Sequence, residues 1–165
     1  MVVSEIERRV IWEGWFSSEV CAGYFAELSG IYRRRQTVST WTTLFFSSGA
    51  VAAAIGAMRG EYEMLVLLFA VLSAGVSLYS VVAHNHQRAT DSADMQFRWA
   101  RLANDYRSLW IDQHAEDATD RLRDLESRRD EISKSGAAFP NKQKHIRRWY
   151  ERTKESLAYA TSSAP

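Results

Sequence analysis

The residues of this chain that could perform acid–base or metal chemistry are four histidines, one cysteine and scattered carboxylates. His84 and His86 lie two positions apart, so on a helix their side chains would point in different directions. His114 lies beside Glu116 and Asp117, without a second histidine at the spacing of a metal site. The sequence contains neither a glycine-rich phosphate loop nor a nucleophile elbow. We therefore assign no catalytic residue, no metal ligand and no cofactor, and we expect that the protein is not an enzyme.

Cys21 is the only cysteine, which excludes disulfides and cysteine-based metal sites within one chain. Its neighbours Val20 and Ala22 are apolar, so we interpret it as a core residue rather than as a reactive thiol. A reducing compartment is compatible with this cysteine content.

Serine and threonine side chains recur at helical spacing within two stretches that carry no charge, residues 36–58 and 64–83. Two interpretations stay open. In the first, the hydroxyl groups and small residues pack the two helices against each other in lipid. In the second, hydroxyl faces from several copies line a water-filled path, because two helices alone enclose nothing. The absence of charge inside both stretches argues against a proton relay. The pore-lining candidates are Ser39, Thr43, Ser47, Ser73, Ser77 and Ser80.

Basic side chains cluster at two places outside the uncharged stretches. Arg33, Arg34 and Arg35 directly precede the first stretch, where they would filter ions or gate the inner mouth of a pore, or merely set the topology. Residues 142–154 are strongly basic and would bind anionic lipid or a nucleotide phosphate. The alternative is a solvated face that balances the acidic segment 112–120. The ligand-binding candidates are Lys144, Arg147, Arg148 and Arg152. The net charge of +1 and the lack of a motif lead us to expect no nucleic-acid partner.

Two long uncharged segments must position the hydroxyl groups. A helix rises about 1.5 Å per residue, so about 20 apolar residues cross the hydrocarbon of a bilayer. Segments 37–58 and 64–83 have that length. A buried hairpin in a soluble protein is the alternative, but it would need apolar surroundings on every side, which the polar remainder of the chain cannot supply. We therefore predict a two-span transmembrane hairpin with a loop at 59–63.

Basic residues near the ends of the two segments predict their orientation. Arg33–Arg35 precede the first segment, and Arg88, Arg98 and Arg101 follow the second, whereas the loop holds only Arg59. The positive-inside rule places both termini in the cytoplasm. The predicted fold is all-α, with a cytoplasmic helical bundle formed by the N- and C-terminal segments. The predicted regions are 1–36, cytoplasmic amphipathic helices; 37–83, the hairpin; and 84–165, cytoplasmic helices.

Helical signals begin near the N-terminus. Ser4 and Glu7 have the spacing of a capping box. The helix that follows would lie on the inner leaflet or dock on protein as an ordinary amphipathic helix, with both interpretations open. Its apolar residues include Ile6, Val10, Trp15 and Phe16, and the face continues toward the first segment through Val20, Tyr24, Leu28 and Ile31.

A heptad-like apolar seam follows the second segment and is suited to helix packing. Gly136 then suits the C′ position that ends a helix, and Pro140 with Asn141 introduces a last helix. The seam comprises Met95, Trp99, Leu102, Tyr106 and Leu109, continued by Leu122, Leu125 and Ile132, and the last helix carries Ile146, Trp149, Tyr150 and Leu157 on one face.

The order of these features resembles the SLATT family, two-span proteins of bacterial conflict systems. The resemblance covers roughly residues 18–160 and rests on Tyr24, Tyr32, the arginines of the lead-in FAELSGIYRRRQ and the small-residue hairpin. It implies an effector of the bacterial inner membrane that acts when a partner detects phage. A nucleotide second messenger or a sensor protein is the implied activating partner.

From the sequence we expect an oligomeric membrane effector. Copies of the chain would associate in the lipid bilayer, form a pore or permeabilise the inner membrane in anti-phage defence, and respond through their cytoplasmic helices. The alternative is a non-conducting, membrane-anchored scaffold that presents a helical interaction domain. An enzyme is the third class, and the missing motifs argue against it.

Overall fold

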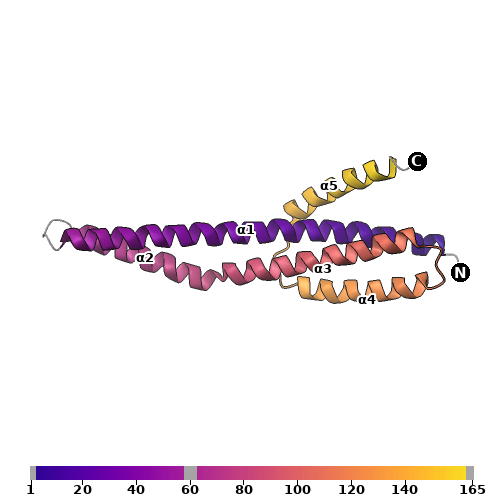
Figure 1. The fold of residues 1–165 in the computed structure, drawn as a ribbon, viewed down its shortest axis with the longest axis horizontal. Helices are drawn as coiled ribbons and strands as arrows, with labels where there is room; N and C mark the ends of the chain where they lie inside the picture. The colour runs from indigo at the N-terminus through magenta and orange to yellow at the C-terminus, as the bar shows by residue number, and fades with distance from the viewer. Residues whose placement is uncertain (1–2, 58–62, 163–165) are drawn as a thin grey trace. The chain divides into compact units, whose positions relative to one another are not determined.

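The computed structural model consists of α-helices only over the residues that it describes, 3–57 and 63–162 (Figure 1). The predicted all-α class is therefore confirmed for this part of the chain. The loop predicted at 59–63 lies outside the described residues apart from its last position, which begins the second helix. The helices are α1 (Glu5–Ala57), α2 (Glu63–Ala83), α3 (Asn85–Ile111), α4 (Ala118–Gly136) and α5 (Gln143–Ser162). The side chains at 47, 50–57, 63, 65–66, 69–70, 80–83 and 158–162 also lie outside the description.

Contacts divide the chain into two compact units. Unit 1 comprises Met1–Leu28 and Ser92–Pro165, so it contains the first part of α1, most of α3, and the whole of α4 and α5. Unit 2 comprises Ser29–Asp91, with the rest of α1, α2 and the first turns of α3. The predicted N-terminal helix, the lead-in and the first uncharged segment are thus parts of one helix.

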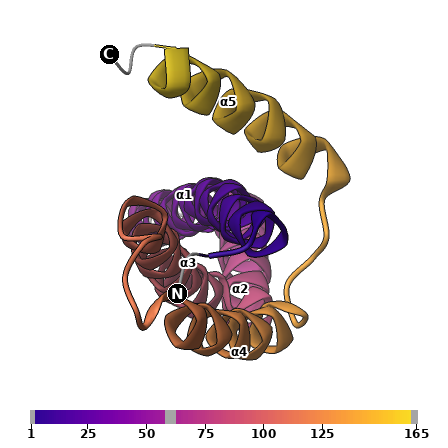
Figure 2. The same ribbon diagram turned by 90° about the vertical axis from the view of Figure 1, so that its right-hand side faces the viewer.

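The core of unit 1 is built on the apolar seam predicted along α3. Met95, Trp99, Leu102, Tyr106 and Leu109 are all buried, and none is more than 5% exposed. α4 lies beside α3 in both views (Figures 1 and 2). Removing these apolar surfaces from water is the main favourable contribution that holds the helices together. The other helices add Leu122, Leu125 and Ile132 from α4 and Ile11, Val20, Tyr24 and Leu28 from α1.

The predicted capping box begins α1. The backbone N–H of Ser4 donates to Glu7 Oε2 at 2.8 Å, and the backbone N–H of Glu7 donates to Ser4 Oγ at 3.2 Å. Two amides that the first turn leaves without helical partners are thereby satisfied. The hydrogen bond from the Ser4 backbone is the main cause that lowers the pKa of Glu7. The Thr119 hydroxyl, near the start of α4, donates to Glu7 Oε1 at 3.3 Å.

Aromatic side chains dock the first turns of α1 on the rest of unit 1. The ring of Trp12 lies 5.7 Å from that of Trp110 in α3. The ring of Phe16 packs edge-on against that of Tyr150 in α5, at 5.0 Å. The N-terminal helix was predicted either to lie on the inner leaflet or to dock on protein. Its aromatic residues dock on protein, whereas Ile6 is 77% exposed.

The prediction that Gly136 takes the C′ position of a helix is wrong. Gly136 is the last residue of α4, and the capping residue Ala137 has right-handed helical backbone angles. A Cβ at this position would lie 3.3 Å from the terminal methyl carbon of Met95 and 3.6 Å from the ring of Phe25. Gly136 therefore lies within the last turn of α4, close to Met95 and Phe25, and is not in a left-handed turn.

In unit 2, α2 and α3 are separated at His84. This residue has a φ of 44°, a left-handed conformation that costs about 1–2 kcal/mol for a residue with a Cβ. Its carbonyl accepts a hydrogen bond from the Arg88 N–H at 3.0 Å, in the first turn of α3. The backbone bond helps to hold His84 in this conformation, so the break between the two helices has a defined position.

Large apolar side chains of unit 2 are exposed along both α1 and α2. Their exposed fractions range from 40% to 87%, and they recur at spacings that gather them on one broad face of each helix. We call this set the apolar face of unit 2. It comprises Val38, Trp41, Leu44, Phe45, Met64, Leu67, Leu68, Val71, Leu72, Leu78 and Tyr79.

Within the described residues, no helix combines the length and the apolar content that crossing a membrane requires. Segments 37–57 and 64–83 are helical, as predicted, but this finding gives their role as spans no support.

Candidate functional site

The hydroxyl residues predicted to line a pore occupy different environments in unit 2. Ser39 is only 6% exposed, and Thr43, about one turn further along α1, is half-buried. On α2, Ser73 is half-buried and Ser77 is exposed. The first hydroxyl of the α1 row is therefore turned inward, whereas Ser77 is turned outward. The two candidates whose side chains lie outside the description are Ser47 and Ser80.

Threonine hydroxyls on α1 are bonded to the backbone of their own helix. The Thr43 hydroxyl donates to the carbonyl of Ser39 at 3.0 Å, and the Thr42 hydroxyl donates to the carbonyl of Val38 at 2.8 Å. Such bonds lower the cost of placing a hydroxyl in apolar surroundings and leave its oxygen able to accept. Ser39 differs, because its buried Oγ has no hydrogen-bond partner among the described residues.

The arginines predicted to act at the mouth of a pore are exposed, and within the described residues none of them forms an ion pair. Arg34 and Arg35 line a groove of unit 2 that also contains Ser39, whereas Arg33 does not line it. Arg33 lies two positions before Arg35, so their side chains point to nearly opposite sides of the helix, which places Arg33 outside the groove. The three charges are therefore not equivalent, although they are adjacent in the sequence.

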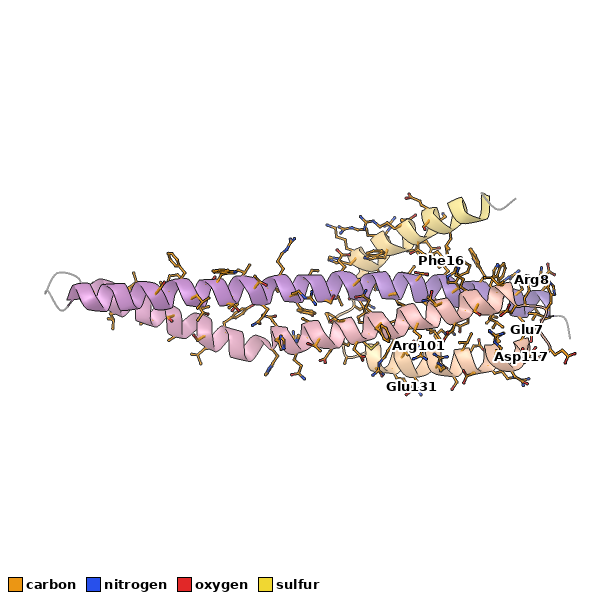
Figure 3. All side chains as sticks on the ribbon, in the orientation of Figure 1. Glu7, Arg8, Phe16, Arg101, Asp117 and Glu131 are labelled. Carbon is orange, nitrogen blue, oxygen red and sulfur yellow. The ribbon has the colours of Figure 1, made fainter. Side chains whose placement is uncertain are left out.

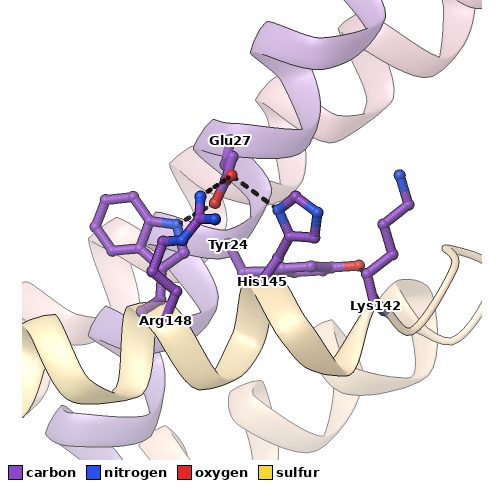
Figure 4. Close-up of polar contacts among 6 residues, drawn as sticks. Tyr24, Glu27, Lys142, His145 and Arg148 are labelled. Atoms are coloured by element: carbon purple, nitrogen blue, oxygen red, sulfur yellow. Dashed lines mark hydrogen bonds and ion pairs between the residues drawn. The ribbon is translucent and has the colours of Figure 1, made fainter.

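A cluster of polar contacts joins α5 to α1 within unit 1 (Figure 4). His145 Nδ1 lies 2.8 Å from Glu27 Oε1, and Arg148 Nη1 donates to the same oxygen at 3.0 Å. The indole N–H of Trp149 donates to Glu27 Oε2 at 2.9 Å. The Glu27 and His145 side chains are 22% and 24% exposed, so their contact is largely shielded from water, whereas Arg148 is 48% exposed. We call these four residues the Glu27 clasp.

Burial alone would raise the pKa of the Glu27 carboxyl. Hydrogen bonds from His145 and Trp149, together with the charges of His145 and Arg148, outweigh burial and hold the pKa below its ordinary value. Glu27 is thus an ionised carboxylate whose two oxygens are both engaged. This geometry suits a contact that fastens two helices, because a general base would need an unengaged oxygen for its substrate.

The Tyr24 hydroxyl positions the connection between α4 and α5. It donates to the carbonyl of Pro140 and accepts from the Lys142 N–H at 3.3 Å. In the same connection, the ring of Phe139 packs edge-on against that of Phe25 in α1, at 5.2 Å. These contacts hold the residues before α5 against α1, so the first turns of α5 begin close to Glu27.

The four predicted ligand-binding residues of α5 divide into two pairs. Arg148 is engaged in the clasp, and the guanidinium of Arg152 lies 5.3 Å from the centre of the Trp149 ring, in cation–π geometry. Lys144 and Arg147 are exposed, and within the described residues neither forms an ion pair. Lys144 and Arg147 are therefore the members of this set that stay available to an anionic ligand or surface.

The acidic segment 112–120 pairs with α4 rather than with α5 in the described part of the chain. Asp112 lies 3.5 Å from Arg121, and Asp120 lies 3.1 Å from Arg123. Figure 3 labels Asp117 at the start of α4. The alternative in which the basic face of α5 balances this segment is therefore not supported by a direct ion pair.

Comparison of the chain with known protein families, with curated protein sequences and with solved structures found no match. Within the described residues, no group of histidine, cysteine, aspartate and glutamate side chains is arranged to hold a metal ion. The function is therefore inferred from the residues and geometry of this chain.

Glu27 was not among the functional residues predicted from the sequence. It is the only charged residue between Glu19 and Arg33, and an isolated charge in an apolar stretch is rarely shielded without a partner. The isolated position of Glu27 was therefore the one sequence signal that it has a partner. Its partners His145 and Trp149 lie 118 and 122 positions away along the chain, and no local pattern predicts which of the many cations would reach it.

Proposed function

We propose that this protein is an oligomeric membrane effector that forms a pore or permeabilises a bacterial inner membrane. Segments 37–58 and 64–83 form a hairpin within the bilayer, and both termini lie in the cytoplasm. A nucleotide second messenger or a sensor protein acts on the cytoplasmic helices and thereby opens the pore. The activity serves anti-phage defence, as the resemblance to the SLATT family implies.

The apolar face of unit 2 is the observation that carries the proposal. Burying one large apolar side chain contributes about 1.5–3 kcal/mol, so leaving this many of them in water is strongly unfavourable. Residues 36–58 and 64–83 contain no charged side chain, so no charge interrupts the apolar face of unit 2. Lipid chains cover such a face, and contacts between copies cover the part of it that faces an oligomer axis.

The Glu27 clasp supports gating through the cytoplasmic helices. α1 runs without a break from Glu5 to Ala57, so the helix held by the clasp is also the helix that carries Arg33–Arg35 and Ser39. An anionic ligand that binds Lys144 and Arg147 would compete with Glu27 for the neighbouring Arg148, because phosphate binds guanidinium strongly. Such competition would loosen α5 from α1.

Ion flux through liposomes that contain the purified full-length protein tests the proposal. We expect liposomes with inserted protein to lose an entrapped ion gradient, while liposomes without protein retain it. Flotation with the liposomes verifies insertion. Inserted protein that leaves the gradient intact would reject pore formation, and a chain that stays dissolved as a compact monomer without detergent would reject the membrane hairpin itself.

The non-conducting scaffold is the second candidate, and the hydroxyl geometry favours it at one point. Ser39 is turned inward and the Thr42 and Thr43 hydroxyls are bonded to their own helix, as expected if these groups serve packing. A scaffold would insert into liposomes and form oligomers without conducting. The flux measurement therefore separates the two candidates directly.

A further inference from the structure

Unit 2 contains a groove between α1 and α2 with a volume of about 660 Å³, within the range of ligand-binding pockets. Arg34, Arg35 and Ser39 line its α1 side, and Val76 and Tyr79 line its α2 side. The groove therefore combines two guanidinium groups, the hydroxyls of Ser39, Thr42 and Tyr79, and an apolar wall.

Three polar residues of the groove, Arg34, Arg35 and Ser39, lack a partner within the described residues, whereas the Thr42 hydroxyl is bonded to the Val38 carbonyl. Arg34 and Arg35 are exposed and form no ion pair within the described residues, so two positive charges line the groove without a counter-charge from that part of the chain. Ser39 is only 6% exposed, and its hydroxyl has no hydrogen-bond partner in the described part of the chain. A buried hydroxyl without a partner is unfavourable, which points to a ligand atom that completes it.

We propose that this groove binds an anionic phospholipid. The phosphate group lies between Arg34 and Arg35 and accepts their charge-assisted hydrogen bonds, and the headgroup or glycerol region accepts the hydrogen bond of the Ser39 hydroxyl. An acyl chain lies along Val38 and Val76. This site rests on the proposed function, because it requires the hairpin to lie in a bilayer.

The apolar wall favours a lipid over a free phosphate compound. Val38 and Tyr79 belong both to the groove and to the apolar face of unit 2, so the wall of the groove continues into that face. A free phosphate would satisfy the arginines but leave Val38, Val76 and Tyr79 against water. A phospholipid matches the charged and the apolar parts together.

Native mass spectrometry of the full-length protein in a phosphate-free detergent measures the binding. We expect phosphatidylglycerol to bind roughly tenfold more tightly than phosphatidylcholine, as one charge-assisted contact is worth about that factor. Arg34→Gln and Arg35→Gln should each remove most of this preference. Arg33→Gln, which removes the same charge from a neighbour outside the groove, should leave it intact. An equal loss in all three variants would show diffuse attraction and overturn the proposal.

A matched pair of variants, Ser39→Ala and Thr40→Ala, tests the contact of the Ser39 hydroxyl with the lipid. Ser39→Ala should weaken phosphatidylglycerol binding severalfold, whereas Thr40→Ala should not, because Thr40 is exposed and its hydroxyl is bonded to the Gln36 carbonyl. An unchanged helical circular-dichroism spectrum in each variant excludes misfolding as the cause. Equal binding by the Ser39→Ala variant and the unaltered protein would remove Ser39 from the site and overturn the three-residue assignment.

Competition separates the two sources of phosphate. Short-chain phosphatidylglycerol should displace the bound lipid, whereas inorganic phosphate at the same concentration should not. Equal displacement by inorganic phosphate would assign the site to a free anion and overturn the lipid proposal. Protein that floats with and conducts through phosphatidylcholine liposomes, yet shows no preference for phosphatidylglycerol, would overturn this site and leave the proposed function standing. Protein that associates with neither liposome would overturn both.

Discussion

At the scale of single residues, Glu27 contributes more to the arrangement of unit 1 than its position in the sequence indicates. One carboxylate receives contacts from three side chains of α5, and each of those contacts joins segments far apart in the chain. Removing it would leave a partly buried imidazole, guanidinium and indole without their shared acceptor. Leaving a shielded polar group without a hydrogen-bond partner costs more free energy than a well-formed hydrogen bond contributes.

Glu27→Gln should lower the free energy of unfolding by about 1–3 kcal/mol at pH 7, because a neutral amide replaces the ionised acceptor. The pKa of Glu27 is lowered in the folded state, so its stabilising effect is present above the unfolded-state pKa, near 4.3, and disappears as pH falls through the lower folded-state pKa. Thermal unfolding in detergent at pH 7 and at about pH 3 should show a difference from the unaltered protein that shrinks with acid. Glu131→Gln, at an exposed carboxylate of α4, serves as the control.

A difference that stays constant between the two pH values would contradict this account of the clasp. It would mean that the carboxylate charge does not hold α5, and that the variant acts through packing alone.

The Cys21 thiol is expected to be unreactive in the folded protein. Burial raises its pKa to about 11, so at pH 8 its thiolate fraction is roughly two orders of magnitude below that of an exposed thiol. Labelling with a maleimide should therefore be about 100-fold slower in the folded protein than after unfolding in dodecyl sulfate. Equal labelling rates before and after unfolding would refute the buried placement.

At the scale of the secondary-structure elements, α1 depends on glycines where aromatic rings from other helices approach it. A Cβ at Gly14 would lie 2.5 Å from ring atoms of Tyr106 in α3, and a Cβ at Gly23 would overlap the ring of Trp149 in α5. Gly30 has open space around its Cβ direction. Along this one helix, Gly14 therefore allows contact with α3, Gly23 allows contact with α5, and Gly30 makes no such contact.

Gly23→Ala should destabilise the protein by about 1–3 kcal/mol, because the added methyl group forces Trp149 and α5 away from α1. In an unobstructed helix the same substitution stabilises by about 1 kcal/mol. Gly30→Ala, on the same helix, is the matched control and should raise stability slightly. Denaturant unfolding followed by tryptophan fluorescence measures both. Stabilisation by both substitutions would show that α5 does not pack closely at Gly23.

At the scale of the whole molecule, polar and apolar surfaces are divided between the two units. Unit 1 has an apolar core with charged residues outside, including ion pairs such as Arg128 with Asp105 at 2.9 Å. Unit 2 exposes its apolar face instead. The proposed membrane hairpin rests on this division, because a bilayer would supply an apolar environment for one unit and leave the other in water.

Ser47→Asp and Ser77→Asp test whether the hydroxyl faces line a conducting path. A carboxylate in the wall of a pore should favour cations and change the ratio of cation to anion flux severalfold in liposomes. Ser77→Asn, which is polar and uncharged, is the control and should leave the ratio close to that of the unaltered protein. Unchanged conductance and ion preference in both aspartate variants would assign these hydroxyls to packing.

Replacing Arg33, Arg34 and Arg35 together by glutamine should change either the ion preference of the liposome flux or the response to an activating ligand. Three positive charges at the mouth of a pore repel cations and attract anions, and their removal takes that bias away. Flux with unaltered ion preference and unaltered activation would leave these arginines with a role in topology only.

Much of the fold follows from local pattern. The capping box of Ser4 and Glu7, the seam from Met95 to Leu109 and the helical state of 37–57 and 64–83 all appear as predicted. These features depend on residues a few positions apart, where the periodicity of a helix decides which side chains share a face. The break at His84 carries no such pattern, because neither glycine nor proline marks it.

The candidate site was only partly predictable for the same reason. The types of its residues are evident from the sequence, since arginines, serines and a basic last helix stand out against the uncharged stretches. Their environments are not. Arg34 and Arg35 line a groove that Arg33 does not, and Arg148 is engaged while Arg147 is exposed.

By itself, the sequence determined where helices form, which faces of them are apolar and where charge is excluded, because these properties depend on neighbours within a few turns. Only the tertiary structure decided that Glu27 meets His145, Arg148 and Trp149, that Gly136 lies in the last turn of α4, and that Ser39 is buried without a hydrogen-bond partner among the described residues. Those outcomes depend on which helices come together, and burial of apolar surface, which drives that association, is not directional.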